Sequence, residues 1–199
     1  MFNNRPYDYF TIYREQIERA LAGIRREPYE AAYETIRAAG LIKRRIFICG
    51  NGGSASITEH FSCDHSKGVH MDTKHLRPDI VSLSSNMATI TAIGNDIGFD
   101  SIFSKQIEFA NGYNEDILIV ISSSGNSPNI VRALEVANDK GMVSIALVGF
   151  DGGRAKELAD IVVHVNSDNY GVIEDCHQII MHSWSQALRI QGSIGELRL

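Results

Sequence analysis

Two pairs of residues have the side-chain types and the spacing of a metal or acid–base site. His60 and Asp64 are four residues apart, so on a helix they share one face. Glu174 and His182 are eight residues apart, a little over two helical turns, and so lie on broadly the same side of a second helix. Two imidazoles and two carboxylates can bind Zn²⁺ or a similar divalent ion, or move a proton between adjacent carbons. Spacing alone also leaves a simple surface or structural contact open for His60 and Asp64.

The remaining histidines give weaker signals. His65, His70 and His75 recur every five residues, which matches no single face of an α-helix, so we expect loop or surface positions for them. His177 lies in the same C-terminal segment as the second pair. On the sequence alone, it could replace one of the four proposed ligands.

A serine-rich segment, residues 122–127, follows an apolar run and reads Ser-Ser-Ser-Gly-Asn-Ser. Ser127 can cap a helix that begins at the next residue, Pro128. Hydroxyls and backbone amides at a helix N-terminus form an anion site. Four serines within six residues, with Gly125 and Asn126 to permit a tight backbone, favour a phosphate loop over an ordinary polar turn.

A second loop, residues 50–55, reads Gly-Asn-Gly-Gly-Ser-Ala and is a weak match to the dinucleotide fingerprint. That fingerprint also needs an acidic residue at the end of the second strand, where this chain has Ser84-Ser85-Asn86. We therefore do not expect nicotinamide or flavin binding.

Five short apolar runs predict strands of a parallel sheet that is buried on both faces. They cover residues 45–49, 80–83, 117–121, 143–148 and 161–165. Helical patterns lie between them, at about 54–67, 86–93, 100–111, 128–140 and 154–159, and a last helix covers about 171–191. This alternation predicts a doubly wound α/β domain, in which ligands bind beyond the carboxyl ends of the strands. Two earlier helices, at about 7–22 and 29–40, are expected to cap the fold or to pack on another subunit.

The composition is that of an ordinary globular domain of 199 residues. The net charge is −5 and no basic stripe is present, so we expect no nucleic-acid partner. No apolar run approaches the ~20 residues that cross a bilayer, and the first residues lack the layout of a signal peptide. Three cysteines do not suggest a disulfide framework. These features predict a cytoplasmic protein that does not associate with membranes.

Taken together, these segments resemble the phosphoheptose isomerases, a branch of the sugar isomerase (SIS) family. The matching residues are the two loops, His60 with an acid at 64, Gly94-Asn95-Asp96-Ile97-Gly98-Phe99, residues 140–142 and 151–153, and the span from Glu174 to His182. The resemblance covers nearly the whole chain. It implies a flavodoxin-like SIS domain with a five-stranded parallel sheet flanked by helices. We expect one domain over residues 1–199, with N-terminal helices in 1–42 and the α/β core and C-terminal helix in 43–199.

The resemblance also implies an activity and a site. The activity is the aldose–ketose isomerisation of D-sedoheptulose 7-phosphate to D-glycero-D-manno-heptose 7-phosphate through an enediol, in a homotetramer. The implied substrate-binding residues are Asn51, Gly52, Gly53, Ser54, Asp64, Asn95, Asp96, Ser122, Ser123, Ser124, Ser127 and Glu174. The implied ligands of Zn²⁺, or of another divalent metal, are His60, Asp64, Glu174 and His182. Asp64, His182 and Glu174 are the implied catalytic residues.

Two positions depart from the pattern of that family, which usually has Glu where this chain has Asp64 and Gln where it has Glu174. Asp is one methylene shorter, and Glu174 adds a negative charge that can strengthen metal binding or take over as base. Two other functions stay open. One is a SIS enzyme that acts on another phosphosugar, and the other is a non-catalytic module that binds a sugar phosphate and regulates a partner.

Overall fold

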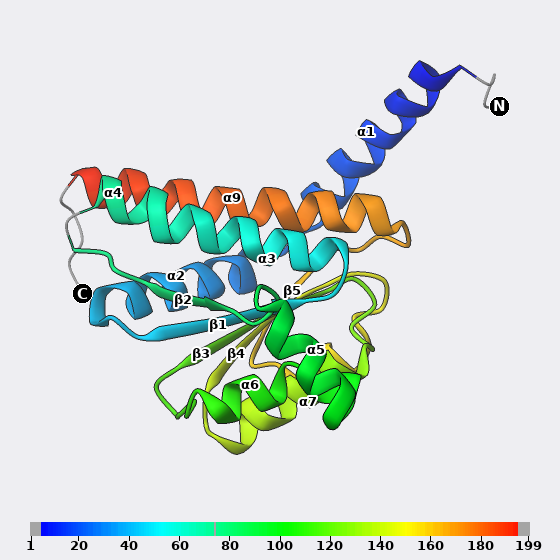
Figure 1. Ribbon diagram of the computed structural model, residues 1–199. Coiled ribbons are helices and arrows are strands. Elements are labelled where there is room, and N and C mark those ends of the chain that lie inside the picture. Colours follow the sequence, from blue (N-terminus) through cyan, green and yellow to red (C-terminus); the bar gives the residue numbers. More distant parts are fainter. Residues whose placement is uncertain (1–4, 74, 195–199) are drawn as a thin grey trace.

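The protein is built around one parallel β-sheet. The computed structural model describes residues 5–73 and 75–194, and the five strands among them run in the order β2-β1-β3-β4-β5 (Figure 1). The strands are β1 (Arg45–Gly50), β2 (Asp79–Ser82), β3 (Ile117–Ser122), β4 (Val143–Val148) and β5 (Ile161–His164). All neighbouring strands are parallel. This is the flavodoxin-like order, and it confirms the predicted fold class.

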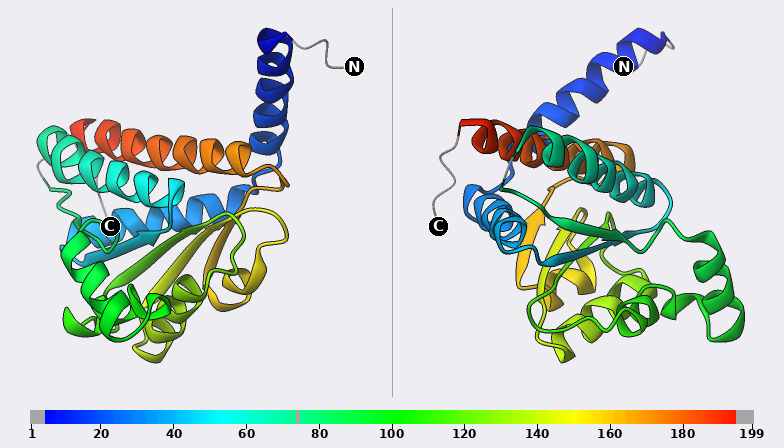
Figure 2. Two further views of the ribbon diagram at one scale, coloured as in Figure 1. Left: turned by 45° about the vertical axis from the view of Figure 1, so that its right-hand side comes forward. Right: turned by 60° about the vertical axis from the view of Figure 1, so that its left-hand side comes forward.

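Helices cover both faces of the sheet, and each face has its own core (Figures 1 and 2). One face carries α2 (Arg26–Ile42), α3 (Gly53–Cys63) and α9 (Tyr170–Ile194). The other face carries α5 (Met87–Asp96), α6 (Ser104–Phe109), α7 (Pro128–Asp139) and α8 (Gly153–Leu158). Side chains alternate along β3, so that Ile119 joins the first core and Val120 joins the second. Strands buried on both faces explain the continuous apolar runs of the sequence.

The helices predicted at about 54–67 and 100–111 differ most from the observed ones. The helix after β1 continues past residue 67, because α3 is followed by a π-helical turn, η1 (Asp64–Val69), and by α4 (His70–Asp72). π turns are frequent at functional sites, and this one begins at Asp64. The helix predicted over 100–111 is instead a 3₁₀ turn, η2 (Phe99–Ser101), followed by the short α6.

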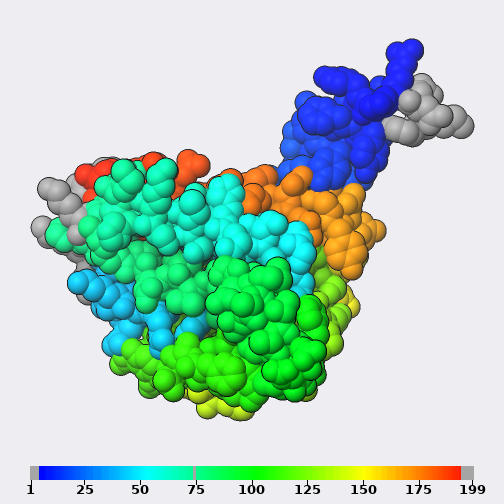
Figure 3. Space-filling view, viewed as in Figure 1, coloured from blue at the N-terminus to red at the C-terminus, as the bar shows by residue number. Residues whose placement is uncertain are grey.

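The two N-terminal helices have different surroundings. Helix α2 packs on the sheet and begins at Arg26, earlier than predicted, because Pro28 fits in a first turn where its missing N–H costs no hydrogen bond. Helix α1 (Pro6–Ala22) projects from the body (Figures 1, 2 and 3). The middle of α1 is tied to α9, since Tyr13 Oη donates to Asp175 Oδ2 at 2.8 Å.

Within the described ranges, no helix combines the length and the apolar character that a membrane crossing needs. The ends of the predicted domain, at residues 1 and 199, lie outside the described residues.

His65 is buried, and the expectation of a loop or surface position for it is wrong. Its Nδ1 lies 2.9 Å from the Phe61 carbonyl oxygen and 3.4 Å from Ser185 Oγ. The five-residue spacing that matches no α-helical face falls here on the π turn, which changes the direction of the side chains. His70 and His75 are exposed, as predicted.

Candidate active site

A small cavity lies at the carboxyl ends of β1 and β3. These strands are neighbours in the sheet, but the helices that follow them cover opposite faces, which makes this position a topological switch point. The cavity has a volume of about 170 Å³. Its lining brings together seven predicted site residues, Asn51, Ser54, Ser122, Ser123, Ser124, Ser127 and Glu174, with Ile121 and Tyr170. It shares Ser124 and Tyr170 with an adjoining hollow of about 810 Å³.

The serine loop, residues 122–127, is braced by the loop after β4. The Gly125 N–H donates to the Ser122 carbonyl at 3.1 Å, and the Gly125 carbonyl accepts from the Ala155 N–H at 2.8 Å. Gly125 has a φ of +64°, and a Cβ there would overlap the carbonyl oxygen of Gly152. Only glycine meets both conditions, so the loop has its shape before any ligand binds.

Two hydroxyls of the serine loop are left for a ligand. Ser123 is only 6% exposed, and among the described residues its Oγ has no hydrogen-bond partner. Ser127 is the N-cap residue of α7, but its hydroxyl makes no capping bond and instead lines the cavity. Buried polar atoms are almost always paired, and the first N–H groups of a helix attract negative charge. The cavity therefore has the chemistry of a phosphate site.

We expect Gly125→Ala to weaken phosphate binding and to destabilise the fold. The new Cβ requires the Gly152 loop to move, and a positive φ costs an L residue roughly 1–3 kcal/mol. The measurements are the Kd of inorganic phosphate by calorimetry and the free energy of unfolding in urea. Gly23→Ala is the matched control, since Gly23 has a φ of −84° and a Cβ there meets its nearest neighbour at 3.5 Å. Wild-type phosphate affinity in Gly125→Ala would contradict a preformed loop.

A second group of side chains lies farther along α3 and α9, the helices that contribute Ser54 and Glu174 to the cavity. His60 Nε2 of α3 and His182 Nε2 of α9 are 3.3 Å apart. The carboxylate of Asp64, at the start of the π turn, lies 3.7 Å from His60 Nε2 and 3.8 Å from His182 Nε2. All three side chains are partly exposed, so this His–Asp–His group is open to small molecules.

The His–Asp–His group fits a zinc ion. Zinc binds imidazole nitrogen at ~2.0–2.1 Å in tetrahedral geometry, which places two nitrogen ligands ~3.3 Å apart. The two Nε2 atoms have this separation. One potential ligand atom from each of His60, Asp64 and His182 lies within 4.8 Å of the other two. Three protein ligands that remain accessible are typical of a catalytic zinc site, which keeps one position for water or substrate.

Glu174, the fourth predicted ligand, lies in the other group. Its carboxylate packs against Gly53, where a Cβ would lie 2.5 Å from Oε2, and it lines the serine cavity. Gln178 instead contacts the His–Asp–His group, with its Nε2 3.1 Å from His182 Nε2. Gln178 is four residues from both Glu174 and His182, a spacing from which it could have been predicted. Glu174 as a metal ligand stays a prediction.

Comparison with known proteins gives the family. A model of the SIS domain family matches residues 8–149. This chain belongs to the SIS domain family. The phosphoheptose isomerase of Helicobacter pylori strain 26695 is 36% identical over 185 residues, which cover 92% of this chain and 93% of that protein. The phosphoheptose isomerase of Shewanella denitrificans is 40% identical over 161 residues, covering 78% and 80%. A solved phosphoheptose isomerase from Francisella tularensis has a TM-score of 0.85 at 33% identity, covering 94% of this chain and 99% of that one.

Four predicted substrate-binding residues of this SIS domain, Gly52, Gly53, Asn95 and Asp96, lie outside both the lining of the serine cavity and the His–Asp–His group. Gly52 and Gly53 are exposed and lie between the lining residues Asn51 and Ser54. Asn95 and Asp96 are exposed at the end of α5, where Asn95 Nδ2 donates to Asp96 Oδ1 at 2.8 Å. Their substrate-binding roles stay predictions.

His177 does not belong to the His–Asp–His group of this SIS domain. It is completely buried, and its Nε2 lies 3.3 Å from the carbonyl oxygen of Val148. The alternative that it replaces a metal ligand is therefore wrong.

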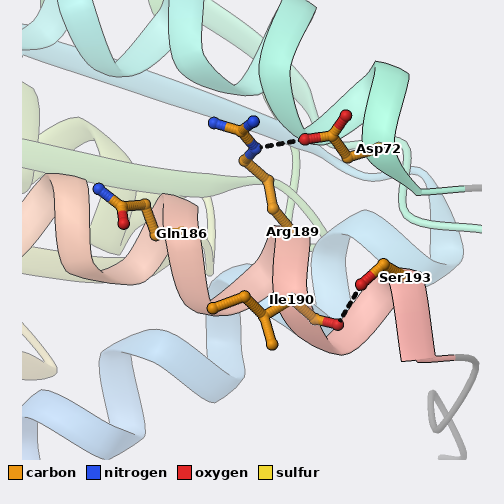
Figure 4. A pocket seen from close by; sticks show the side chains of 5 residues that line it. All are labelled: Asp72, Gln186, Arg189, Ile190 and Ser193. Carbon is orange, nitrogen blue, oxygen red and sulfur yellow. Dashed lines mark hydrogen bonds and ion pairs between the residues drawn. The ribbon is translucent and has the colours of Figure 1, made fainter.

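A cavity of about 420 Å³ at the far end of α9 has different chemistry (Figure 4). Its cation, Arg189, donates to the carboxylate of Asp72, which neutralises it. Gln186, Ile190 and Ser193 complete the lining, and none of these residues belongs to the predicted site. Because its cation is already paired, this cavity has fewer groups available to bind a phosphate than the serine loop has.

Proposed function

We propose that this SIS domain is an aldose–ketose isomerase that converts D-sedoheptulose 7-phosphate to D-glycero-D-manno-heptose 7-phosphate. The observation that carries this proposal is an anion cavity and a His–Asp–His group on one pair of helices. Ser54 and Glu174 line the cavity, and His60 and His182 follow six and eight residues later, ~9–12 Å along the helix axes. An open-chain seven-carbon sugar carries its phosphate and its carbonyl at opposite ends, and therefore suits two separated groups. The named relatives support the same substrate.

The serine loop has the task of binding the phosphate and fixing one end of the sugar. Asp64, the carboxylate of the His–Asp–His group, takes a proton from C1 while O2 gains one, which gives the enediol. Glu174, the other predicted base, lies at the phosphate end of this arrangement. His182 moves a proton on the oxygen side or returns one to C2, and loss of the O1 proton completes the aldose. His60, Asp64 and His182, with Glu174 as the fourth candidate, would hold Zn²⁺, and the bound ion would supply polarisation of the carbonyl and hydroxyl oxygens.

The proposed assembly is a homotetramer in the cytoplasm. The support for an assembly is helix α1, which projects from the body and leaves Tyr7 75% and Phe10 56% exposed (Figure 3). Exposed apolar rings that gather on one element mark protein contact sites, and a second copy of the chain would cover them. The support for a reducing compartment is that Cys49, Cys63 and Cys176 are free thiols.

The test is an NMR assay of the purified protein with sedoheptulose 7-phosphate in D₂O, with and without added Zn²⁺. We expect an aldoheptose phosphate that carries deuterium at C2, because the enediol exchanges its proton with solvent. Fructose 6-phosphate and an amino-sugar phosphate serve as parallel substrates. Conversion of one of these alone would replace the heptose by another phosphosugar, and binding without any conversion would favour a regulatory module.

A further inference from the structure

Asn129 of α7 contacts Asn51 of the glycine loop through a reciprocal amide pair. Asn51 Nδ2 donates to Asn129 Oδ1 and Asn129 Nδ2 donates to Asn51 Oδ1, both at 2.9 Å. Turning either carboxamide alone would place N–H against N–H and oxygen against oxygen. Each residue therefore fixes the orientation of the other. Asn129 is 2% exposed, whereas Asn51 is half-buried and lines the serine cavity.

The amide pair spans the topological switch point. Asn51 follows β1, and Asn129 lies in the first turn of the helix after β3, a strand that pairs directly with β1. The backbone after Asn51 does little to fix the position of the Asn51 side chain, since Gly52 has a φ of +54° and a Cβ there would meet nothing within 4 Å. Glycine allows many backbone conformations. The contact with Asn129 is therefore what relates the Asn51 side chain to the serine loop.

Asn51 keeps hydrogen-bonding capacity for a ligand. A carboxamide has two N–H donors and two acceptor lone pairs, and the pair with Asn129 uses one of each. Because Asn51 lines the cavity and Asn129 is buried, the remaining N–H and lone pair of Asn51 are available on the cavity side. The two groups point in different directions, so each can meet a different hydroxyl of a sugar, as acceptor or as donor.

We infer that Asn129 is a positioning residue of the isomerase, which holds Asn51 in the orientation that meets a hydroxyl of the phosphosugar. The inference rests on the proposed function. Asn129 acts through Asn51 and touches no substrate itself. If Asn129 had a purely structural role, its removal would destabilise the fold, and its effect on turnover would not depend on whether Asn51 is present.

A double-mutant cycle with Asn51→Ala and Asn129→Ala tests this link. We expect Asn129→Ala to lower kcat/KM for sedoheptulose 7-phosphate by roughly tenfold to 10²-fold, the scale of a misplaced contact group. The double variant should lose no more than Asn51→Ala alone, and the Kd of inorganic phosphate should stay unchanged in Asn129→Ala. Asn138→Ala is the matched control, because Asn138 lies on the same helix and donates to the Leu158 carbonyl at 3.0 Å, away from the cavity. It should keep the wild-type kcat/KM.

Losses that multiply in the double variant would overturn the inference, as would wild-type kcat/KM in Asn129→Ala. Loss of phosphate binding together with turnover would also overturn it, because that result indicates a structural role. If the alanine variant does not fold, Asn129→Asp takes its place, since it keeps the acceptor for Asn51 and removes the donor. A wild-type protein that binds the phosphosugar without converting it would overturn the proposed function alone. The double-mutant cycle would then compare the Kd of that phosphosugar among the variants, in place of kcat/KM.

Discussion

His182→Ala is expected to lower the kcat of sedoheptulose 7-phosphate isomerisation by ~10²–10⁴-fold, the usual contribution of a positioned proton-transfer group. The structure gives the reason, since His182 Nε2 lies 3.3 Å from His60 Nε2 and 3.8 Å from the Asp64 carboxylate. Alanine removes both the proposed proton-transfer group and one candidate zinc ligand. The KM should change far less, because the serine loop proposed to bind phosphate is a separate group. Steady-state kinetics and the zinc content of the purified variant are the two measurements.

His75→Ala is the matched control for this prediction. His75 is exposed and does not belong to the His–Asp–His group, so its loss should change neither kcat nor zinc content. Full turnover in His182→Ala would show that the proposed role is wrong. Full zinc content with low turnover would assign His182 to proton transfer and leave the metal to other residues.

The fold was predictable from the sequence because its strands are buried on both faces. Such strands appear as continuous β-branched runs, and all five lie within about one residue of their predicted limits. The helix after β1 was less predictable, since a π turn has no signal in hydrophobic periodicity. That turn decides which way His65 faces, and the prediction failed there. Prediction therefore worked where burial alone sets the pattern and failed where backbone geometry changes within a helix.

The site was predictable where its residues are local. The serine loop is a continuous segment that opens a helix, and all four of its serines line the cavity. Asn129 was missed because it looks like an ordinary helical residue, and its role depends on a contact between segments that are 78 residues apart. The place of Glu174 depends on its packing against Gly53, which spacing along one helix cannot encode. Pairings between distant loops thus require the structure, whereas single loops can be recognised from the sequence.

Acidification is expected to destabilise the protein strongly, because two histidines are buried in the neutral form. Desolvation by burial lowers the pKa of His177 from 6.5 to about 4, partly opposed by its hydrogen bond to the Val148 carbonyl. Burial likewise lowers the pKa of His65 to about 4. The unfolded chain binds protons at these histidines below pH 6.5, whereas the folded chain does not do so until about pH 4. The contribution of these two histidines to the free energy of unfolding is therefore fully present above pH 6.5, and it is lost as the pH falls toward 4.

The expected loss is about 3 kcal/mol for each histidine at pH 4, which together is comparable with the whole stability of many domains. Urea unfolding at a series of pH values, at one protein concentration and with a metal chelator present, measures it. His177→Leu should roughly halve the slope of unfolding free energy against pH. The Val148 carbonyl would still accept the Val165 N–H at 2.8 Å, so this variant leaves no unpaired oxygen there. His70→Leu, at an exposed position, should leave the slope unchanged. An unchanged slope in His177→Leu would mean that His177 is protonated in the folded protein, and that its burial does not exclude charge.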